Sequence, residues 1–248
     1  MRTLLLLLSI IVFFIFSLIL FPVTWLIGKR SPAAQEKIER TVVRGFIRYA
    51  LWLSGTKVTV IGLENVPQDR SVLYVPNHRS YFDILLLYRD VTRQTGFLAK
   101  KEIGKVPILS LWLKRLGGFL LDRENIKEGL KTILAAIESV KNGVSMVVFA
   151  EGTRGKDGPD TNLAPLHEGS FKISVKSGCP IIPVSISNSS TILEDHFPWI
   201  RSTRVIVEYG APIDPASLTG DDRKFIGRYV HGIIEETLKK NRDTLGTI

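Results

Sequence analysis

Residues 77–83 read NHRSYFD and place an imidazole and a carboxylate within one short stretch. Imidazole has its pKa near neutrality, so His78 is suited to removing the proton of a hydroxyl nucleophile. A carboxylate nearby, such as Asp83, would fix the imidazole tautomer and stabilise the imidazolium that forms. The same residues also fit a helix capping box, because Ser80 and Asp83 match S-x-x-D before an apolar run. Read alone, the stretch favours the capping interpretation.

A second group of residues is suited to binding an anion. Residues 151–154 read EGTR after an apolar run, where glycine permits close approach of the backbone and arginine's planar fork can bind a phosphate through two bonds. Glu151 would orient that arginine or another cation. An aspartate-arginine pair ending in Arg123 follows another apolar run, and Lys100 and Lys105 add cations near a further strand end. Taken singly, each is also typical of a surface ion pair or a solvated lysine run.

The sequence lacks several common catalytic signatures. It contains no G-x-S-x-G elbow, no G-x-x-x-x-G-K-[ST] loop, no G-x-G-x-x-G and no H-E-x-x-H. The single cysteine excludes an internal disulfide framework and a cysteine-based zinc cluster. Cys179 precedes Pro180 beside an apolar strand, which favours a small buried residue over a nucleophile. The usual covalent, nucleotide and zinc mechanisms therefore have no local signature here.

The elements that would position these residues are short strands alternating with helices. Seven strand candidates follow one another from Lys57 onward: KVTVIGL, SVLYVP, GFLAK, GGFLLD, SMVVFA, IIPVSIS and TRVIVEYG. This alternation predicts an α/β fold with a mixed, largely buried sheet flanked by helices. The polar stretch 152–162 follows a strong strand, as do the loops in which α/β proteins place their chemistry.

Two helices are clear in the second half of the chain. The first runs from about Asn125 to Lys141 and stops at Asn142-Gly143. Its apolar residues are expected on one face: Ile126, Leu130, Ile133, Leu134, Ile137 and Val140. The C-terminal helix shows the same spacing, with Phe225, Tyr229, Ile233 and Leu238.

The N-terminal segment predicts a membrane anchor. Residues 3–28 contain no charge and are long enough to cross a hydrocarbon layer of about 30 Å. A cleaved signal peptide is the alternative, but the apolar run exceeds the usual length and no A-x-A-like site follows. A retained helix is therefore favoured. Whether residues 4–27 span the bilayer or bend back within one leaflet is left open, since Pro22 and Gly28 permit a bend.

An amphipathic basic helix is expected next, between residues 31 and 55. Its apolar positions are Ile38, Val42, Phe46, Tyr49 and Leu53. Its basic positions are Lys37, Arg40, Arg44 and Arg48. The pattern suits an anionic lipid surface, and the alternative is a helix packed on its own domain. Residues 1–55 would thus be membrane-anchoring helices, with an α/β domain at 56–248 on the cytoplasmic side, where the basic residues favour its placement.

The net charge of +9 and the pI near 9.7 indicate an anionic partner. Nucleic acid, a phosphorylated substrate and an acidic membrane surface all fit that charge. The aromatic-interleaved basic surface of a nucleic-acid-binding module is not evident, and a membrane anchor would be unusual in one. No nucleic-acid partner is therefore expected.

The combination of these stretches resembles the glycerolipid acyltransferase family, and most of all its bacterial 1-acyl-sn-glycerol-3-phosphate (lysophosphatidic acid) acyltransferases. That family carries four ordered blocks: N-H-x4-D, a glycine-led apolar run ending in D-R, E-G-T-R, and an apolar strand containing P-[VI]. Here they read NHRSYFD, GGFLLDR, EGTR and CPIIPVSI, and the resemblance covers roughly residues 57–209.

The resemblance implies a role for each matching residue. His78 would be the general base that deprotonates the acceptor hydroxyl, and Asp83 would orient it. The IIPVSI strand would line the acyl or pantetheine side. The substrate phosphate would be bound by Arg123, Glu151, Gly152, Thr153 and Arg154, with possible help from Lys100 or Lys105. No metal or bound cofactor is expected, because a thioester donor is already activated.

Three departures from the family pattern concern the phosphate site. Gly155 stands where the third block often has serine, and Leu120 stands where an aromatic is usual. His167 replaces the lysine of a common P-F-K-x-G, which weakens the case for a phosphate-binding cation from this position. It leaves room for a different acceptor headgroup.

The resemblance therefore implies a membrane-bound enzyme that moves a fatty acyl chain to the sn-2 hydroxyl of lysophosphatidic acid and forms phosphatidic acid. The donor would be acyl-CoA or acyl carrier protein, both of them acidic. Membrane lipids would be the other partners. The alternatives are another lysophospholipid or a lyso-aminolipid as acceptor, and a non-catalytic module that recognises anionic lipids.

Overall fold

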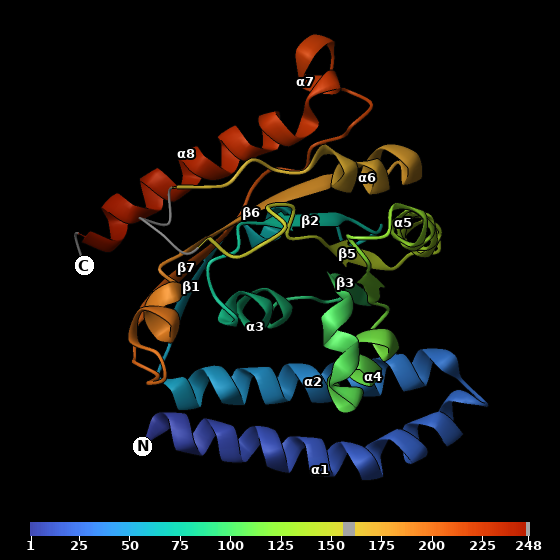
Figure 1. Ribbon diagram of the computed structural model, residues 1–248, viewed down its shortest axis with the longest axis vertical. Helices are drawn as coiled ribbons and strands as arrows, with labels where there is room; N and C mark the ends of the chain where they lie inside the picture. Colours follow the sequence, from blue (N-terminus) through green and yellow to red (C-terminus); the bar gives the residue numbers. More distant parts are fainter. Residues whose placement is uncertain (156–161, 247–248) are drawn as a thin grey trace.

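A seven-stranded sheet forms the centre of the computed structural model, which describes residues 1–155 and 162–246 (Figure 1). Its strands lie in the order β1-β7-β6-β2-β5-β3-β4. The bounds are β1 Lys57–Ile61, β2 Leu73–Pro76, β3 Thr95–Lys100, β4 Phe119–Leu121, β5 Ser145–Val147, β6 Ile181–Ser187 and β7 Arg204–Tyr209. Strands β6, β2, β5, β3 and β4 run parallel to one another, whereas β7 is antiparallel to β6, and β1 is parallel to β7. The mixed sheet and all seven strands predicted from the sequence are confirmed.

The sheet has a hydrophobic core on each face, because successive side chains of a strand point to opposite sides. Leu73 and Val75 of β2 belong to one core cluster, and Tyr74 between them belongs to the other. All seven residues of β6 are buried, as its almost wholly apolar sequence requires in the middle of a covered sheet.

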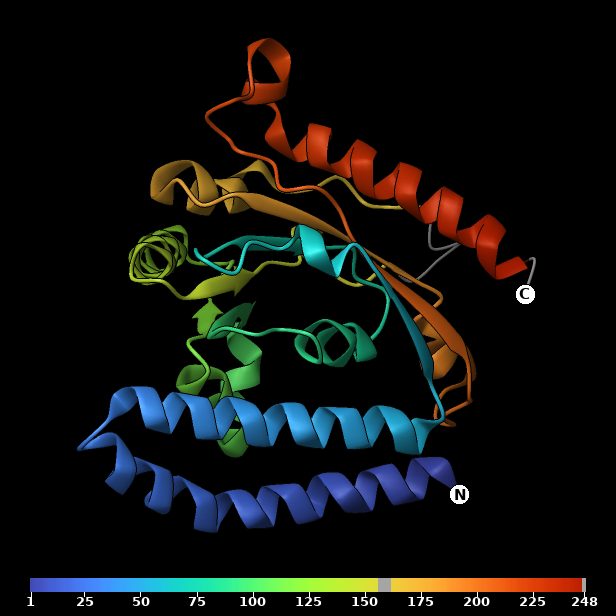
Figure 2. The same cartoon turned by 180° about the vertical axis from the view of Figure 1, so that it is seen from behind.

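Helices cover both faces (Figures 1 and 2). The first face carries α5 Ile126–Lys141, α6 Lys172–Ser177 and α8 Ile226–Gly246, with the short α7 Gly220–Lys224 before α8. The second face carries α2 Pro32–Ser54, α3 Phe82–Tyr88 and α4 Pro107–Arg115. Short 3-10 turns complete the chain: η1 Leu63–Asn65, η2 Lys101–Lys105, η3 Glu168–Phe171, η4 Ser190–Ile192 and η5 Glu194–His196.

Helix α5 has the predicted limits, and its apolar face is only partly buried. The Asn125 side chain caps its start by accepting from the Lys127 and Glu128 amides, each at 3.1 Å. Ile137 and Val140 are buried, whereas Ile126 is 87% exposed and Leu130 and Leu134 are also exposed. At about 100° per residue all six residues still lie within about 120° of one another, so they share one side of the helix as predicted. The body covers only part of that side, and these three residues are left at the surface.

The N-terminal segment is an antiparallel helical hairpin of α1 Arg2–Gly28 and α2, which lies along the base of the α/β body in both views (Figures 1 and 2). The turn falls at residues 29–31, where the Ser31 hydroxyl caps α2 by accepting from the Ala34 amide at 3.2 Å. The Phe13 and Phe46 rings stack at 4.1 Å between the two helices. Helix α1 is long and apolar enough to cross a membrane, by length and composition.

Polar contacts attach both ends of α1 to the body. Near its start, the Thr3 hydroxyl accepts from the Ile200 amide at 2.9 Å. Near its end, Arg115 of α4 donates to the Thr24 hydroxyl at 2.9 Å and pairs with Glu39 of α2. No motif in the sequence indicated these contacts. Helix α1 therefore lies along the body instead of projecting away from it.

The basic side of α2 is divided between the body and solvent. Arg40 donates to the Thr92 carbonyl at 2.8 Å, and Arg44 donates to the Arg89 carbonyl at 3.3 Å. For these two arginines the alternative interpretation holds, because they pack on the protein's own α/β body. Lys37 and Arg48 are exposed, and their contact with lipid stays a prediction.

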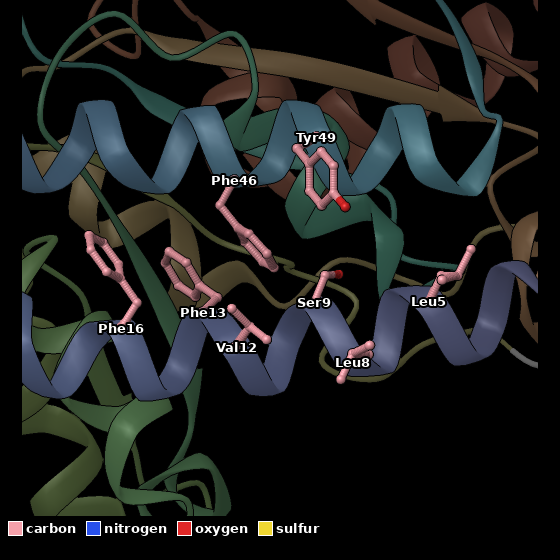
Figure 3. Close-up of a pocket in the computed structure, with 8 residues that line it drawn as sticks. All are labelled: Leu5, Leu8, Ser9, Val12, Phe13, Phe16, Phe46 and Tyr49. Carbon is pink, nitrogen blue, oxygen red and sulfur yellow. The ribbon is translucent and has the colours of Figure 1, made fainter.

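The surface between α1 and α2 holds an open apolar groove of about 380 Å³ (Figure 3). Phe46 and Tyr49 of α2 face it from one side. From α1 it is lined by Leu5, Leu8, Ser9, Val12, Phe13 and Phe16. The outer side of α1 continues this apolar surface, since most of its leucines, isoleucines and valines are exposed.

Candidate functional site

The chemical residues predicted from the sequence gather where parallel strands end. Strands β6, β2, β5, β3 and β4 all present their carboxyl ends at one edge of the sheet. His78 follows β2, Glu151 follows β5, and Arg123 follows β4. Lys100 is the last residue of β3 and aligns with Leu121 of β4. Of the polar stretch 152–162, residues 156–161 lie outside the described residues.

His78 and Asp83 form a hydrogen-bonded pair. The Nδ1 atom of His78 lies 2.9 Å from Oδ2 of Asp83, which is fully buried. An ionised carboxylate can only accept, so Nδ1 carries the hydrogen and Nε2 keeps its lone pair. The His78 side chain is 16% exposed. This arrangement can accept a proton at Nε2 and hold the resulting positive charge against Asp83.

Asp83 is at the same time a helix cap. Its Oδ2 atom also accepts from the backbone amides of Arg79 at 2.7 Å and Ser80 at 2.8 Å. The Ser80 hydroxyl in turn accepts from the Phe82 amide at 3.0 Å. The capping box and the histidine partner predicted from the sequence are thus one structure, and the cap fixes the carboxylate that meets the imidazole.

Aromatic rings form one side of the histidine site. The His78 ring stacks on Phe149 with centroids 3.9 Å apart and an interplanar angle of 26°. Phe149 in turn stacks on Phe97 of β3 at 6.4 Å. This wall restricts the imidazole to the plane in which Nδ1 meets Asp83.

Asn77 ties the histidine turn to the neighbouring strand. Its buried side chain accepts from the Ile186 amide at 2.7 Å and donates to the Ile186 carbonyl at 3.0 Å. Both bonds run from the end of β2 to β6. Asn77 therefore works as a backbone clamp that sets where His78 leaves the sheet.

Glu151 accepts hydrogen bonds from backbone amides and forms none with Arg154. This corrects the expectation that it orients that arginine. One carboxylate oxygen accepts from the His78 amide at 2.7 Å, and the other accepts from the Ala164 amide at 3.1 Å. The residue is 4% exposed, and burial raises the pKa of this carboxyl. Negative charge and burial both disfavour direct contact with a phosphate. Glu151 instead joins the histidine turn to the chain at Ala164.

The structure brings Arg123 and Gly152 into contact. Arg123 Nη1 donates to the Gly152 carbonyl. Gly152 has φ +81°, a left-handed conformation, and a Cβ there would lie 2.8 Å from Nε2 of His167. His167, which replaces the lysine of the family's P-F-K-x-G, has its ring against this glycine. Arg123 and His167 therefore both lie against Gly152.

Arg154 lies between an aromatic ring and a carboxylate. Its guanidinium carbon is 3.5 Å from the centroid of the Tyr81 ring. Its Nη1 atom donates to Oε1 of Glu194 at 3.3 Å. Glu194 begins η5 and belongs to no recognisable motif, so sequence reasoning missed it.

The remaining predicted phosphate residues are less closely connected. Lys100 and Lys105 are exposed, and among the described residues neither side chain forms a hydrogen bond or ion pair. Thr153 is exposed in the turn. It is Lys101, between the two lysines, that pairs with Asp122 at 3.1 Å.

Within residues 1–155 and 162–246, no three His, Cys, Asp or Glu side chains are grouped as metal ligands would be.

The chain is similar to known proteins over most of its length. The family model described as Acyltransferase matches residues 57–187. A 1-acyl-sn-glycerol-3-phosphate acyltransferase of Saccharomyces cerevisiae is 31% identical over 216 residues, which are 87% of this chain and 69% of that protein. One from Borreliella burgdorferi is 26% identical over 204 residues, 82% of this chain and 79% of that protein.

A solved structure shares the fold. It is the crystal structure of the 1-acyl-sn-glycerophosphate (LPA) acyltransferase PlsC from Thermotoga maritima, with a TM-score of 0.82 and 25% sequence identity. The match covers 96% of this chain and 95% of that one, so it includes the helical hairpin as well as the α/β body.

Proposed function

The chain belongs to the acyltransferase family, and we propose that it transfers a fatty acyl chain from a thioester to the sn-2 hydroxyl of 1-acyl-glycerol-3-phosphate. The product is phosphatidic acid. The observation that carries the proposal is the pairing of His78 with buried Asp83 at the strand ends where Arg123 and Arg154 also lie.

His78 is the general base in this proposal. Its Nε2 atom takes the hydroxyl proton while the hydroxyl oxygen bonds to the thioester carbonyl carbon. The tetrahedral intermediate collapses, the carbon–sulfur bond breaks, and the leaving thiolate takes the proton from the imidazolium. Asp83 stabilises that imidazolium through Nδ1. The reaction requires no protein nucleophile, metal or bound cofactor, since the thioester is already activated.

Arg154 and Arg123 bind the acceptor's phosphate in this proposal. A guanidinium has five N–H donors, and Glu194 and Gly152 each engage one nitrogen of these arginines. The other donors suit a phosphomonoester. Gly152 and Thr153 bring backbone close to it, and Lys100 or Lys105 adds positive charge at the rim. Glu151 contributes by holding the turn and not by touching phosphate.

We propose that the hairpin holds this chemistry at a membrane, with α1 within one leaflet on the cytoplasmic side that the basic residues after it favour. Both ends of α1 contact the same body, through Thr3 and Thr24, while its outer side is apolar. Thr3→Cys and Lys29→Cys, each combined with Cys179→Ala, test this with a membrane-impermeant thiol reagent in sealed vesicles. Labelling of both from one side supports the proposal, and labelling from opposite sides contradicts it.

An acyl-transfer assay that crosses donors with acceptors tests the function. Acyl-CoA and acyl carrier protein are each offered with lysophosphatidic acid, a phosphodiester lysophospholipid, a lyso-aminolipid and monoacylglycerol. We expect phosphatidic acid as the main product and at least about tenfold slower transfer to acceptors without a phosphomonoester. The donor that supports faster turnover identifies the acyl source, which the charge of +9 leaves undecided.

His78→Ala supplies the mechanistic control in the same assay. We expect it to abolish transfer while the protein remains folded and membrane-bound. Near-normal turnover by His78→Ala would overturn the mechanism. A clear preference for another headgroup would overturn the acceptor.

A further inference from the structure

Glu194 connects two segments that the proposed function uses separately. Its Oε2 atom accepts from the Ser80 hydroxyl at 2.6 Å, and its Oε1 atom accepts from the Tyr81 amide at 2.8 Å. The same Oε1 atom accepts from Arg154 Nη1 at 3.3 Å. Ser80 and Tyr81 belong to the histidine turn, whereas Arg154 belongs to the anion-binding turn after β5. One carboxylate thus touches both.

The three partners of Glu194 all donate. They are a hydroxyl, a backbone N–H and a guanidinium, and only an acceptor can satisfy all three together. An ionised carboxylate accepts at both oxygens, and hydrogen bonds to a charged acceptor are stronger than neutral ones. The position is therefore matched chemically to a glutamate.

Arg154 is held on two sides by this arrangement. Tyr81 packs against the face of the guanidinium, and Glu194 engages one end of it. The stacked ring restricts tilt and the carboxylate restricts rotation in the plane. The N–H groups that Glu194 does not engage then have a defined direction.

A continuous chain of hydrogen bonds relates Arg154 to His78. His78 Nδ1 meets Asp83 Oδ2, which accepts from the Ser80 amide. The hydroxyl of the same Ser80 meets Glu194, and Glu194 meets Arg154. Every link is between 2.6 and 3.3 Å. Asp83 and Glu194 therefore both accept hydrogen bonds from Ser80, so the positions of His78 and Arg154 are set relative to the same residue.

We propose that Glu194 is a positioning residue that sets the place of the Arg154 guanidinium relative to the His78 imidazole. The inference rests on the proposed function. In the acceptor, the reacting hydroxyl and the phosphate are separated by only two carbons and an ester oxygen. The base and the phosphate-binding arginine must therefore keep a matching separation, and a displacement of about 1 Å can lower a rate by about 100-fold.

Kinetics of Glu194→Ala test this role, with Asp195→Ala as the matched control. Asp195 is the next residue of η5 and accepts from Ser190 at 3.0 Å instead of from Arg154. We expect Glu194→Ala to lower kcat/KM for lysophosphatidic acid by about 10- to 100-fold, mainly through a higher acceptor KM. Asp195→Ala is expected to match wild type. Glu194→Gln, which keeps the shape and one oxygen that can accept from Tyr81 and Arg154, should recover part of the loss.

A double-mutant cycle with Arg154→Ala separates positioning from general support of the fold. If Glu194 acts through Arg154, Glu194→Ala should reduce kcat/KM by no more than about threefold in the Arg154→Ala background. Full additivity of the two changes, or an equal fall in kcat for every acceptor with KM unchanged, would overturn the inference. Failure of wild type to acylate lysophosphatidic acid would instead overturn the proposed function, so the two failures are distinguishable.

Discussion

Asp83 holds His78 with the same carboxylate oxygen that accepts from the backbone at the start of α3. Oδ2 of Asp83 takes three hydrogen bonds, from His78 Nδ1 and from the amides of Arg79 and Ser80. Its other oxygen is buried and has no partner among the described residues. The orientation of the imidazole is therefore tied to the geometry of a helix cap and not to a flexible side chain.

Asp83→Asn should separate the charge of this residue from its shape. The amide oxygen can still accept from the backbone, but no negative charge remains to stabilise an imidazolium. We expect kcat to fall by about 100-fold or more with little change in acceptor KM. Steady-state kinetics check this, with Asp69→Asn at an exposed position as control. A fall confined to KM would contradict the assignment of Asp83 to the base.

Arg154→Ala should act mainly on acceptor binding. Hydrogen bonds to a charged phosphate contribute about 1.5–3 kcal/mol, so we expect acceptor KM to rise by about 10- to 100-fold and kcat/KM to fall accordingly. Initial rates across a range of lysophosphatidic acid concentrations measure both, with Arg70→Ala as an exposed-arginine control. An unchanged preference for phosphorylated over unphosphorylated acceptors would argue against a phosphate role.

Gly152→Ala should disrupt the turn that carries Arg154. The backbone is left-handed at φ +81°, and the added methyl would lie 2.8 Å from His167 Nε2 and 3.2 Å from Arg123 Nη1. We expect activity to fall by about tenfold or more through displacement of these side chains. Gly169→Ala is the matched control, because a Cβ there meets nothing within 4 Å. Equal activity of the two variants would show that the turn tolerates the strain.

Arg115→Met should destabilise the attachment of the helical hairpin. Glu39 is 1% exposed and pairs with Arg115, so the substitution leaves a buried carboxylate without its cation. Breaking a buried ion pair on one side costs about 3–5 kcal/mol. Thermal unfolding in detergent should show a lower Tm than wild type. A second variant that also carries Glu39→Leu should regain much of the loss, and a double variant no more stable than Arg115→Met would contradict this account.

Cys179 should resist thiol reagents in the folded protein. The side chain is buried, and burial raises the pKa of the thiol above its ordinary value, which disfavours the reactive thiolate. Since it is the only cysteine in the chain, labelling reports one site. We expect slow labelling near pH 8 that accelerates to the rate of a free thiol in denaturant. Rapid labelling of the native protein would show that the site opens locally.

The elements of the fold could be predicted because their signals are local. Each strand is an apolar run bounded by polar or turn residues, and α5 begins at an asparagine cap and ends before Gly143. The pairing of His78 with Asp83 was likewise accessible, since five residues and a capping box bring the two together. Composition and spacing are therefore enough to predict the strands, α5 and the His78–Asp83 pair.

Contacts that span the sequence could not be predicted in the same way. Glu194 meets Ser80 across 114 residues, and Asn77 meets Ile186 across 109. Neither contact leaves a pattern in a single sequence, because the tertiary fold alone creates it. Glu151 was expected to orient an arginine, yet it binds backbone amides, which every residue other than proline has. The pattern of side chains in the sequence therefore does not indicate which residues Glu151 binds.

The exposed residues of α5 show a further limit. Apolar spacing predicts that a helix is amphipathic, but the width of the buried face depends on which neighbours lie beside it. Ile126, Leu130 and Leu134 are exposed although helical spacing puts them on the same side of α5 as Ile137 and Val140. A periodic pattern indicates a helix, and only packing decides which of its apolar residues are covered.

The joint core of the hairpin and the sheet bears on how the protein can be handled in solution. Phe21 of α1 and Leu51 of α2 belong to the same hydrophobic cluster as Tyr74 and Val184 of the sheet. Deleting the hairpin to obtain a water-soluble enzyme would leave that cluster bare and invite aggregation. Substituting polar residues for outward-facing ones such as Leu8 and Ile19 keeps the cluster covered. Detergent-free preparations are therefore better sought by redesigning the outer side of α1 than by truncation.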